Sequence, residues 1–491
     1  MTTLMMTKRT TKTTATKRTL PHWGSLFVLA CVMMSGSVTW GRDLHVDPVS
    51  GKDSNDGIAA PVKTIARGIA LALPGDTVHL KPIVYHDLAS FTNRHGLPDH
   101  PITLDGHGAT LNGAEALIAA DWEEVAPGRF RNERLMPSFN AAMLGRWYFL
   151  FDGRPVHMGR TSKGKQAPLK TPESLQPGEW TFVPSTESAA DPSRRLTGAF
   201  YIQIQPGQKF DDAKISFPLR SNGVQLGGKN SHLVIRNITA THVWNDGFNI
   251  HGDCNDVHFE NIRAIECGDD GISGHETAKY TVHRFYAEGN STGICDVNFS
   301  ETTYENVEIR DCIAFDLYFL NHGKYKVTNA IIHSTSERGL VVTPGGAMPA
   351  CQVELENILF LRKGPPINAF VGNDTTLTVN RSTFVNLGFS VAAGTVSFEK
   401  SLLAGQPPQN LILGNGAKWT GRDNLYDLNS YRVQAQGITR EGFVSYQQES
   451  ANEIGSQWKT VEIVDGTPAN VPAGIGFDRS RFKSVEMTPA K

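Results

Sequence analysis

A short unit, Asp-Gly-apolar-x-x-His, occurs twice in this sequence, from Asp246 to His251 and from Asp270 to His275. Equivalent residues of the two units are 24 positions apart, and Asp269 directly precedes the second unit. If the backbone brings such positions into register on neighbouring strands, the two repeated carboxyls lie about 5 Å apart. Two carboxyls at that separation do not both ionise readily, so the pair is a candidate site of acid–base chemistry.

Three outcomes are open for this stack of carboxyls. In the first, the three aspartates supply a general acid and an ionised partner, which glycoside hydrolysis requires, and the two histidines orient or tune them. In the second, a Ca²⁺ ion is bound by carboxylate oxygens, with Glu276 joining Asp246 and Asp270. In the third, the aspartates are structural, because an Asp-Gly turn is often capped by its own carboxylate.

The positions of six asparagines predict the elements that would create this register. Each closes a short run of alternating apolar residues, and successive asparagines are 23 to 28 residues apart, or 45 in one case. They are Asn237, Asn261, Asn306, Asn329, Asn357 and Asn380. A period near 23 is typical of a β-solenoid, whose stacked coils let each asparagine hydrogen-bond to its neighbours. We therefore predict an all-β solenoid, and we assign His283 to the place that the long step leaves without an asparagine.

The rest of the chain divides around this repeat. Residues 1–41 carry a basic stretch, a short apolar run and then small residues, which is the order of a secretory signal and predicts a secreted or periplasmic protein. Residues 42–119 are expected to hold an N-terminal capping helix, at 61–73, and the first coils. The aromatic and proline-rich stretch 120–220 breaks the period and is predicted to be a small inserted β-domain. The main array would occupy 221–446, and 447–491 would form an irregular tail.

Composition excludes several classes of partner. The formal net charge is -2 and the sequence pI about 6.8, so a nucleic-acid or anionic-membrane partner is not expected once the signal is removed. Five cysteines follow the signal, and no C-x-x-C pair suggests a zinc site. Cys267 and Cys312 would lie two coils apart, too far for a disulfide, so we predict free, mostly buried thiols in a monomeric protein.

Several segments resemble a known superfamily. Val46–Gly57, Pro61–Ile65 and Pro74–Val78 resemble the opening of the pectate-lyase-like right-handed parallel β-helix proteins, which include polysaccharide lyases. The aperiodic stretch is similar to the insert of β-helix glycoside hydrolases of families 120 and 141. Asn245-Asp246-Gly and Gly268-Asp269-Asp270 are similar to paired motifs of polygalacturonases, whose aspartates are the catalytic acids, although the Gly-His-Gly and Arg-Ile-Lys motifs of that family are absent. The resemblance implies a right-handed parallel β-helix.

These observations lead us to expect a secreted enzyme that cleaves glycosidic bonds of a polysaccharide lying along the coils, without a cofactor. The residues expected to contact the sugar are Trp244, Asn249, Lys279, Arg284 and Tyr318. One alternative is a Ca²⁺-dependent lyase that acts by β-elimination on uronates, with a lysine or arginine as the base. Another is a non-enzymatic solenoid that binds glycans or belongs to a surface layer.

Overall fold

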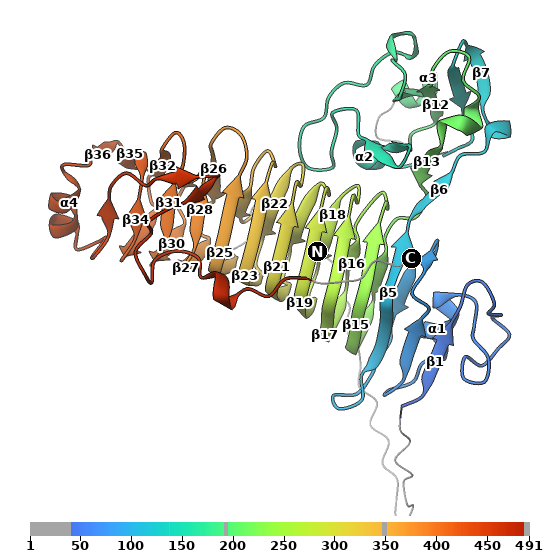
Figure 1. Cartoon of the computed structure of the whole chain (residues 1–491), viewed down its shortest axis with the longest axis horizontal. Coiled ribbons are helices and arrows are strands. Elements are labelled where there is room, and N and C mark those ends of the chain that lie inside the picture. The colour runs from blue at the N-terminus through green and yellow to red at the C-terminus, as the bar shows by residue number, and fades with distance from the viewer. Residues whose placement is uncertain (1–40, 137, 191–194, 346–350, 486–491) are drawn as a thin grey trace, which may run out of the picture. The chain divides into compact units, whose positions relative to one another are not determined.

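Two long parallel sheets form the body of the protein in the computed structural model (Figure 1), which describes residues 41–136, 138–190, 195–345 and 351–485. Strands from successive coils pair in parallel, so the predicted all-β solenoid is confirmed. The signal predicted at 1–41 lies, apart from its last residue, outside the described residues. Among the helices in the described ranges, none is long and apolar enough to cross a membrane.

Each coil contributes one long and one short run of strand. The 17-stranded sheet contains β1 (Asp43–Val46), β2 (Thr77–Leu80), β3 (Val84–Tyr85), β5 (Ile102–Asn112), β15 (Lys229–Thr241), β17 (Asp253–Ile265), β19 (Lys279–Glu288), β21 (Glu301–Arg310), β23 (Lys324–Ser334), β25 (Gln352–Arg362), β27 (Thr376–Asn380), β28 (Thr383–Val385), β30 (Thr395–Glu399), β31 (Leu402–Ala404), β33 (Lys418–Arg422), β34 (Leu425–Tyr426) and β37 (Gln457–Trp458). The 12-stranded sheet contains β4 (Ala89–Thr92), β14 (Val224–Gly227), β16 (Phe248–Ile250), β18 (Asp270–Gly274), β20 (Thr292–Asp296), β22 (Phe315–Leu320), β24 (Leu340–Thr343), β26 (Ile367–Val371), β29 (Leu387–Val391), β32 (Gln409–Leu413), β35 (Leu428–Val433) and β36 (Gln436–Ile438).

A row of residues with left-handed backbone bends the long strands at one corner of the solenoid. Asn237 and Asn261 have φ values of 57° and 54°, and Asn261 Nδ2 donates to Asn237 Oδ1 at 2.9 Å. In the next coil Arg284, with φ 64°, holds this place, because the register pairs Glu260 with His283. The assignment of His283 was therefore wrong by one residue. So was that of Asn380, because the register pairs Asn380 with Glu356 and leaves Arg381, with φ 48°, at the corner.

The space between the two sheets is filled by one continuous apolar core. Each of the five described cysteines is free and buried, which confirms the predicted thiols. Cys254, Cys267, Cys312 and Cys351 belong to this core. Cys295 does not, because it follows the inward-facing Ile294 on β20 and successive residues of a strand point to opposite faces.

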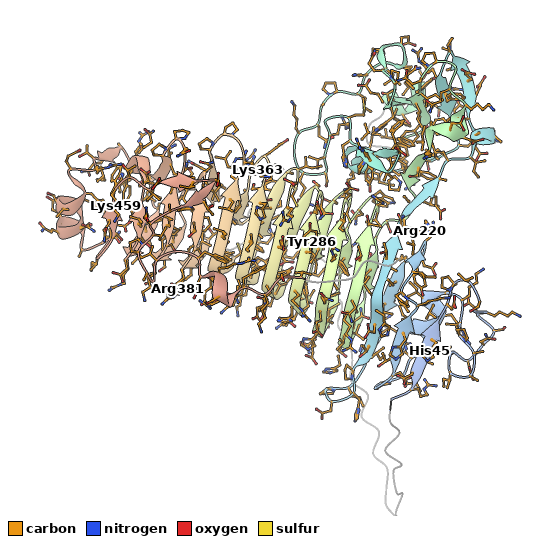
Figure 2. The ribbon with its side chains drawn as sticks, in the orientation of Figure 1. His45, Arg220, Tyr286, Lys363, Arg381 and Lys459 are labelled. Atoms are coloured by element: carbon orange, nitrogen blue, oxygen red, sulfur yellow. The ribbon has the colours of Figure 1, made fainter. Side chains whose placement is uncertain are left out.

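Residues 114–218, which we call the antiparallel segment, leave the solenoid after β5 and return through Arg220 (Figures 1 and 2). One of its two sheets contains β6 (Ala114–Ala116), β9 (Phe149–Phe151), β10 (Arg154–Val156) and β13 (Ile215–Pro218), and the other contains β7 (Glu123–Ala126), β8 (Arg129–Asn132), β11 (Glu179–Pro184) and β12 (Gly198–Gln203). It also holds the helices α2 (Ala141–Arg146) and α3 (Thr186–Ala190). Buried aromatic rings, including those of Trp147, Trp180 and Phe200, form its core.

Both ends of the described chain pack on the coils. Helix α1 (Ile65–Leu71) is shorter than the stretch predicted at 61–73; it starts at the capping residue Thr64 and contacts β1, β2 and β4. After α4 (Phe443–Ser450), the tail returns along the asparagine corner. There Asp478 N donates to Asn357 Oδ1 at 2.6 Å, and Lys483 N donates to Asn306 Oδ1 at 2.9 Å.

Candidate active site

Three aspartates lie together at the start of the short strands. Asp246 precedes β16, and Asp270 begins β18 in the equivalent place of the next coil, since Phe248 pairs with Ile272. One carboxylate oxygen of each of Asp246, Asp269 and Asp270 lies within 4.8 Å of the others. Their exposed fractions are only 2%, 3% and 2%, so the three carboxyls form a buried cluster.

Asp246 is held by neighbours from the adjacent coils. Its Oδ1 accepts from Asp270 N at 3.1 Å, and its Oδ2 accepts from Ser273 Oγ at 2.7 Å. Asn222 in the preceding coil accepts from Asp246 N at 3.1 Å. Burial, followed by the negative charge of Asp269, raises the pKa of Asp246 to about 6.

Two cations from the antiparallel segment reach the cluster. Lys163 Nζ donates to Asp269 Oδ1 and, at 2.6 Å, to Asp270 Oδ1, and Arg146 Nη2 lies 3.1 Å from Asp269 Oδ2. Burial acts to raise the pKa of Asp269, but Lys163 and Arg146 outweigh it, and the pKa is lowered. Burial and the charge of Asp269 raise the pKa of Asp270 well above its usual range, even though Lys163 opposes them. The lowered pKa therefore holds Asp269 ionised, whereas the raised pKa values of Asp246 and Asp270 favour their protonated forms.

Lys163 stands on a small hairpin loop that covers the cluster. This lysine loop, residues 159–167, follows β10 and is closed at its base by Ala167 N, which donates to Gly159 O at 3.1 Å. Thr161 Oγ1 donates to Ser291 Oγ on the solenoid, and Lys165 N donates to Glu337 Oε1 at 3.2 Å. No residue of the loop, all of which the structure describes, belongs to either of the two larger apolar cores, and these hydrogen bonds tie the loop to the solenoid.

The two repeated histidines stack at the other end of the short strands. Their ring centroids are 4.0 Å apart with an interplanar angle of 8°. His275 Nε2 lies 3.2 Å from Ser273 Oγ, which links the ring to Asp246, and burial lowers the pKa of His275 to about 4. His251 Nδ1 lies 3.1 Å from Glu276 Oε2. At neutral pH His275 is thus an uncharged neighbour of the carboxyl cluster.

Glu276 lies outside the group of converging carboxyls. Asp270 begins β18 whereas Glu276 follows its end, and the Glu276 carboxylate accepts instead from Gly252 N at 2.9 Å. The third carboxyl that converges with Asp246 and Asp270 is that of Asp269. The calcium set predicted from the sequence, Asp246, Asp270 and Glu276, is therefore not the set that the strands bring together.

Three of the predicted sugar-contacting residues lie on or next to the short-strand face. Asn249 pairs with Ser273 in the register and donates through Nδ2 to Gln225 Oε1 at 3.1 Å. Trp244 packs against the aromatic core of the antiparallel segment. Tyr318, in the same row as Cys295, stacks on Phe315 with ring centroids 4.2 Å apart.

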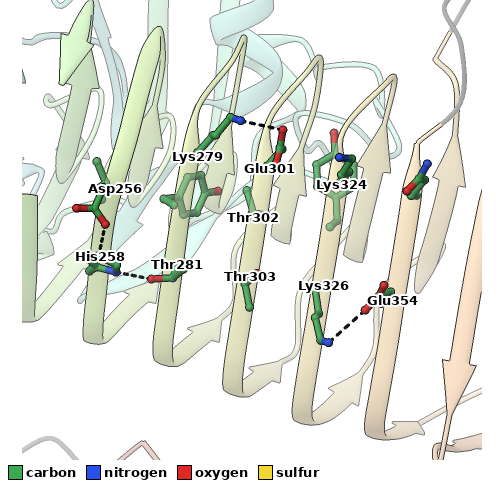
Figure 3. A pocket seen from close by; sticks show the side chains of 14 residues that line it. Asp256, His258, Lys279, Thr281, Glu301, Thr302, Thr303, Lys324, Lys326 and Glu354 are labelled. Carbon is green, nitrogen blue, oxygen red and sulfur yellow. Dashed lines mark hydrogen bonds and ion pairs between the residues drawn. The ribbon is translucent and has the colours of Figure 1, made fainter. Parts of the chain in front are cut away.

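Lys279 and Arg284 are not brought to the cluster. Both belong to β19 of the other sheet, because the chain has turned the corner after β18. Lys279 Nζ lies 3.0 Å from Glu301 Oε1 beside a shallow pocket of about 380 Å³ that crosses β17 to β25 (Figure 3). Arg284 pairs with Glu260 at 3.1 Å. The structure therefore separates these two predicted sugar-contacting residues from the carboxyl cluster, since spacing along the sequence does not reveal which face a strand presents.

Sequence reasoning missed Arg146, Lys163 and Ser273. The two cations lie in the aperiodic stretch, 106 residues or more before the aspartates that they contact, and no pattern there marks them. Ser273 had a usable signal, because it stands two residues before His275 in the repeated unit and alternation along a strand puts it on the same face.

Comparisons with a family model and with solved structures identify the fold of this chain. Residues 222–400 match the family model described as "Right handed beta helix region". The structure of XylC in complex with xylose aligns with 86% of this chain and 88% of its own at 11% identity, with a TM-score of 0.55. The protein is thus a right-handed parallel β-helix, and the resemblance inferred from its opening segments is confirmed at the level of fold.

Two further solved structures are more distant. A rhamnogalacturonan lyase aligns with 87% of this chain and 90% of its own, with 11% identity and a TM-score of 0.31. The GH136 lacto-N-biosidase from Eubacterium ramulus aligns with 80% of this chain and 64% of its own, with 10% identity and a TM-score of 0.32. No curated protein matches the sequence.

Proposed function

We propose that this protein is an exported enzyme that hydrolyses glycosidic bonds with the cluster of Asp246, Asp269 and Asp270. The observation that carries the proposal is the divergence of their pKa values within one buried cluster: that of Asp269 is lowered while those of Asp246 and Asp270 are raised. Titratable groups whose surroundings push their pKa values apart are the acid and base pairs of enzymes. The fold shared with XylC supports a carbohydrate substrate only as an analogy.

The spacing of the carboxyls favours the retaining form of hydrolysis. One oxygen of each of the three carboxyls lies within 4.8 Å of the others. Retaining glycosidases separate the two carboxyls by about 5–5.5 Å, whereas inverting ones leave about 6.5–9.5 Å for a water molecule. In this proposal Asp246 donates its proton to the leaving oxygen while the Asp269 carboxylate bonds to the anomeric carbon. Water then attacks the anomeric carbon, Asp246 takes a proton from that water, and the Asp269 carboxylate is released.

A substrate reaches the cluster when the lysine loop lifts. The carboxyls are almost fully buried, and the ammonium of Lys163 occupies the space between Asp269 and Asp270. Beside them the hydroxyl of Thr292, which pairs with Asp270 in the register, is buried without a partner among the described residues. Sugar hydroxyls are suitable replacements for the ammonium and partners for Thr292.

The charges at the cluster favour hydrolysis over β-elimination. A lyase needs an unprotonated base and a cation that neutralises the uronate. Burial acts to lower the pKa of Lys163, but Asp269 and Asp270 outweigh it and raise the pKa well above its ordinary value, so this lysine stays protonated. Lys279 and Arg284 pair with acids on the other sheet. The lyase nevertheless remains the second candidate because the three carboxylate oxygens converge as cation ligands do.

The test incubates purified residues 42–491 with a panel of neutral and acidic polysaccharides. New reducing ends and the ultraviolet absorbance of an unsaturated uronate are followed together. Reducing ends without absorbance, lost in Asp246→Asn and Asp269→Asn, support hydrolysis. The matched control is Asp253→Asn, since Asp253 is exposed on β17. Both signals rising together, and falling with a chelator, would establish the lyase instead, and silence across the panel would leave a binding or structural role.

A further inference from the structure

Two rows of side chains lead away from the carboxyl cluster along the outer face of β18, β20 and β22. The first row consists of Asp270, Thr292 and Phe315, and the second of Ser273, Cys295 and Tyr318. Neighbouring strands of a sheet lie about 4.8 Å apart, so each coil adds one step of that length to both rows. In the two coils that follow Asp270, neither row carries a charged side chain. A substrate that extends from the cluster along these rows therefore meets uncharged groups.

Thr292, the first residue after the cluster in its row, has a buried hydroxyl group. The residue is 0% exposed, and its Oγ1 has no hydrogen-bond partner among the described residues. The neighbouring Asp270 differs, because its carboxylate accepts from Lys163. A buried polar group without a partner is unfavourable and rare in native proteins. The hydroxyl is thus a hydrogen-bonding group that a ligand on this face can satisfy.

The next coil presents an apolar surface beside this hydroxyl. Ala314, Phe315 and Val341 form an apolar cluster that is separate from the core between the sheets, and Tyr318 packs against it. The rings of Phe315 and Tyr318 are stacked, with an interplanar angle of 7°. Sites for small molecules combine apolar and aromatic walls with a few placed polar groups, and Thr292 supplies such a polar group here.

The lysine loop lies over the coils that carry these residues. Its Thr161 Oγ1 donates to Ser291 Oγ, just before β20. Its Gly164 approaches Ala314, just before β22, so closely that a Cβ added to the glycine would lie 3.0 Å from the Cβ of Ala314. Movement of the loop away from the carboxyls, which the proposed function requires, therefore also uncovers the start of β20 and of β22.

We propose that Thr292, Phe315 and Tyr318 form the subsite for the sugar unit next to the cleaved bond, and that this unit is uncharged. The inference rests on the proposed function, because that function places the cleaved bond at the carboxyl cluster. Thr292 Oγ1 hydrogen-bonds to a hydroxyl of the sugar, and the aromatic pair contacts the apolar face of the same ring. An ionised unit is disfavoured because none of the three side chains could pair with its charge, which would lose its hydration.

Calorimetry tests the subsite on the full chain carrying Asp269→Asn, in which the proposed reaction cannot consume the ligand. The probes are the neutral xylotetraose, cellotetraose, mannotetraose and maltotetraose and the acidic tetragalacturonate. At least one neutral tetrasaccharide should bind more tightly than tetragalacturonate. Thr292→Val keeps the shape of the side chain but removes its hydroxyl, so it should weaken that binding about tenfold, whereas Thr292→Ser should retain it. Tyr318→Ala removes a half-buried ring and should also weaken it about tenfold.

Two further variants separate this subsite from other ways of binding a saccharide. Thr303→Val is the matched control, because Thr303 is an exposed threonine on β21 of the other sheet, and it should leave the affinity unchanged. Arg338→Met tests an acidic ligand, since the positive charges of Lys163 and Arg338 act on Tyr318. The proposal would be overturned by absence of binding of every neutral tetrasaccharide, by unchanged affinity in Thr292→Val, or by tighter binding of tetragalacturonate that is lost in Arg338→Met.

Failure of the subsite is distinguishable from failure of the proposed function. Binding that weakens in Thr292→Val, while the unsubstituted protein hydrolyses no member of the polysaccharide panel, would support the sugar contacts of Thr292 and overturn the proposed reaction. Hydrolysis of a panel member, with unchanged affinity in Thr292→Val, would overturn the subsite alone. Thermal melts show that each variant is folded.

Discussion

At the residue scale, one side-chain type takes on different chemistry according to its neighbours. Asp246 and Asp269 are both buried, yet only Asp269 is paired with Arg146 and Lys163, so their pKa values move in opposite directions. The sequence could predict the aspartates, because they recur with the period of the coils. It could not predict the two cations, because their contacts depend on how a distant stretch packs.

The proposed acid has a consequence for the pH profile. Asp246 acts while protonated, and its pKa is about 6, so kcat/KM should fall as pH rises through that value. Ser273 Oγ donates to the Asp246 carboxylate and so lowers this pKa. Ser273→Ala should therefore move the alkaline limb to higher pH. Profiles of the variant and of Ser397→Ala, a serine on the outer surface of the other sheet, provide the measurement; a limb that stays in place would argue against Asp246 as the acid.

At the scale of elements, periodic features could be predicted and aperiodic ones could not. The asparagine corner was predicted because its amides repeat in five coils, and the errors arose where the corner residue is not an asparagine, at Arg284 and at Arg381. The lysine loop does not repeat along the sequence. Its two arms pair with each other, Arg160 with Gln166, rather than with a strand of the solenoid. Its position over the aspartates is therefore a finding of the structure alone.

The asparagine corner should depend on both its amide and its backbone. Asn329 has φ 55°, and its Oδ1 accepts from Asn357 Nδ2 at 2.9 Å. Asn329→Gly removes the bond and keeps the backbone free, which should cost about 1–3 kcal/mol of unfolding free energy. Asn329→Ala adds left-handed strain of about 1 kcal/mol or more. Chemical denaturation of both variants measures the difference, and equal stability of the two would show that the left-handed backbone carries no strain here.

The lysine loop should open without unfolding of the solenoid. Cys295 on the outer face of β20 is 2% exposed and lies close enough to Asp270 and Lys163 for their charges to affect its pKa. Lys163→Met removes the main polar contact at the loop tip, which should speed maleimide labelling of Cys295 about tenfold if the contact is worth about 1.4 kcal/mol. Peptide mass mapping measures the extent of labelling at each cysteine separately.

Lys165→Met is the matched control for this labelling, because Lys165 is exposed on the same loop and binds Glu337 only through its backbone N–H. The core thiols Cys267 and Cys312 report global unfolding. If Cys295 reacts only together with them, the loop does not open on its own.

At the scale of the whole described unit, the solenoid follows from repetition, whereas the site requires two separate parts of the chain. Each coil buries its apolar face against its neighbours, so a periodic sequence predicts the stack. The antiparallel segment supplies Arg146 and Lys163 from outside the period. Lys279 was assigned to the same site and belongs to another face, since the period gives the order of coils but not the direction of each side chain.

A buried carboxyl inside the solenoid should make the free energy of unfolding depend on pH. Asp296 is buried and accepts from Tyr280 Oη and Thr302 Oγ1, each at 2.7 Å, and burial raises its pKa from 3.8 to about 6. Below the unfolded pKa this carboxyl is neutral in both states. As pH rises through about 6, the folded state loses up to about 3 kcal/mol relative to the unfolded state. In Asp296→Asn, the loss of unfolding free energy between pH 4 and pH 7 should be smaller by this amount; a loss equal to that of the unmodified protein would refute the assignment.

The most direct test of the central claim is the fate of water oxygen during cleavage by residues 42–491. The reaction is run in water enriched in the heavy oxygen isotope ¹⁸O, with a substrate that the panel identifies. Mass spectrometry then measures the masses of the products. Hydrolysis at the carboxyl cluster predicts one heavy oxygen at each new reducing end, and no product from Asp269→Asn. Products without heavy oxygen that carry an unsaturated uronate, or unchanged cleavage by Asp269→Asn, would contradict it.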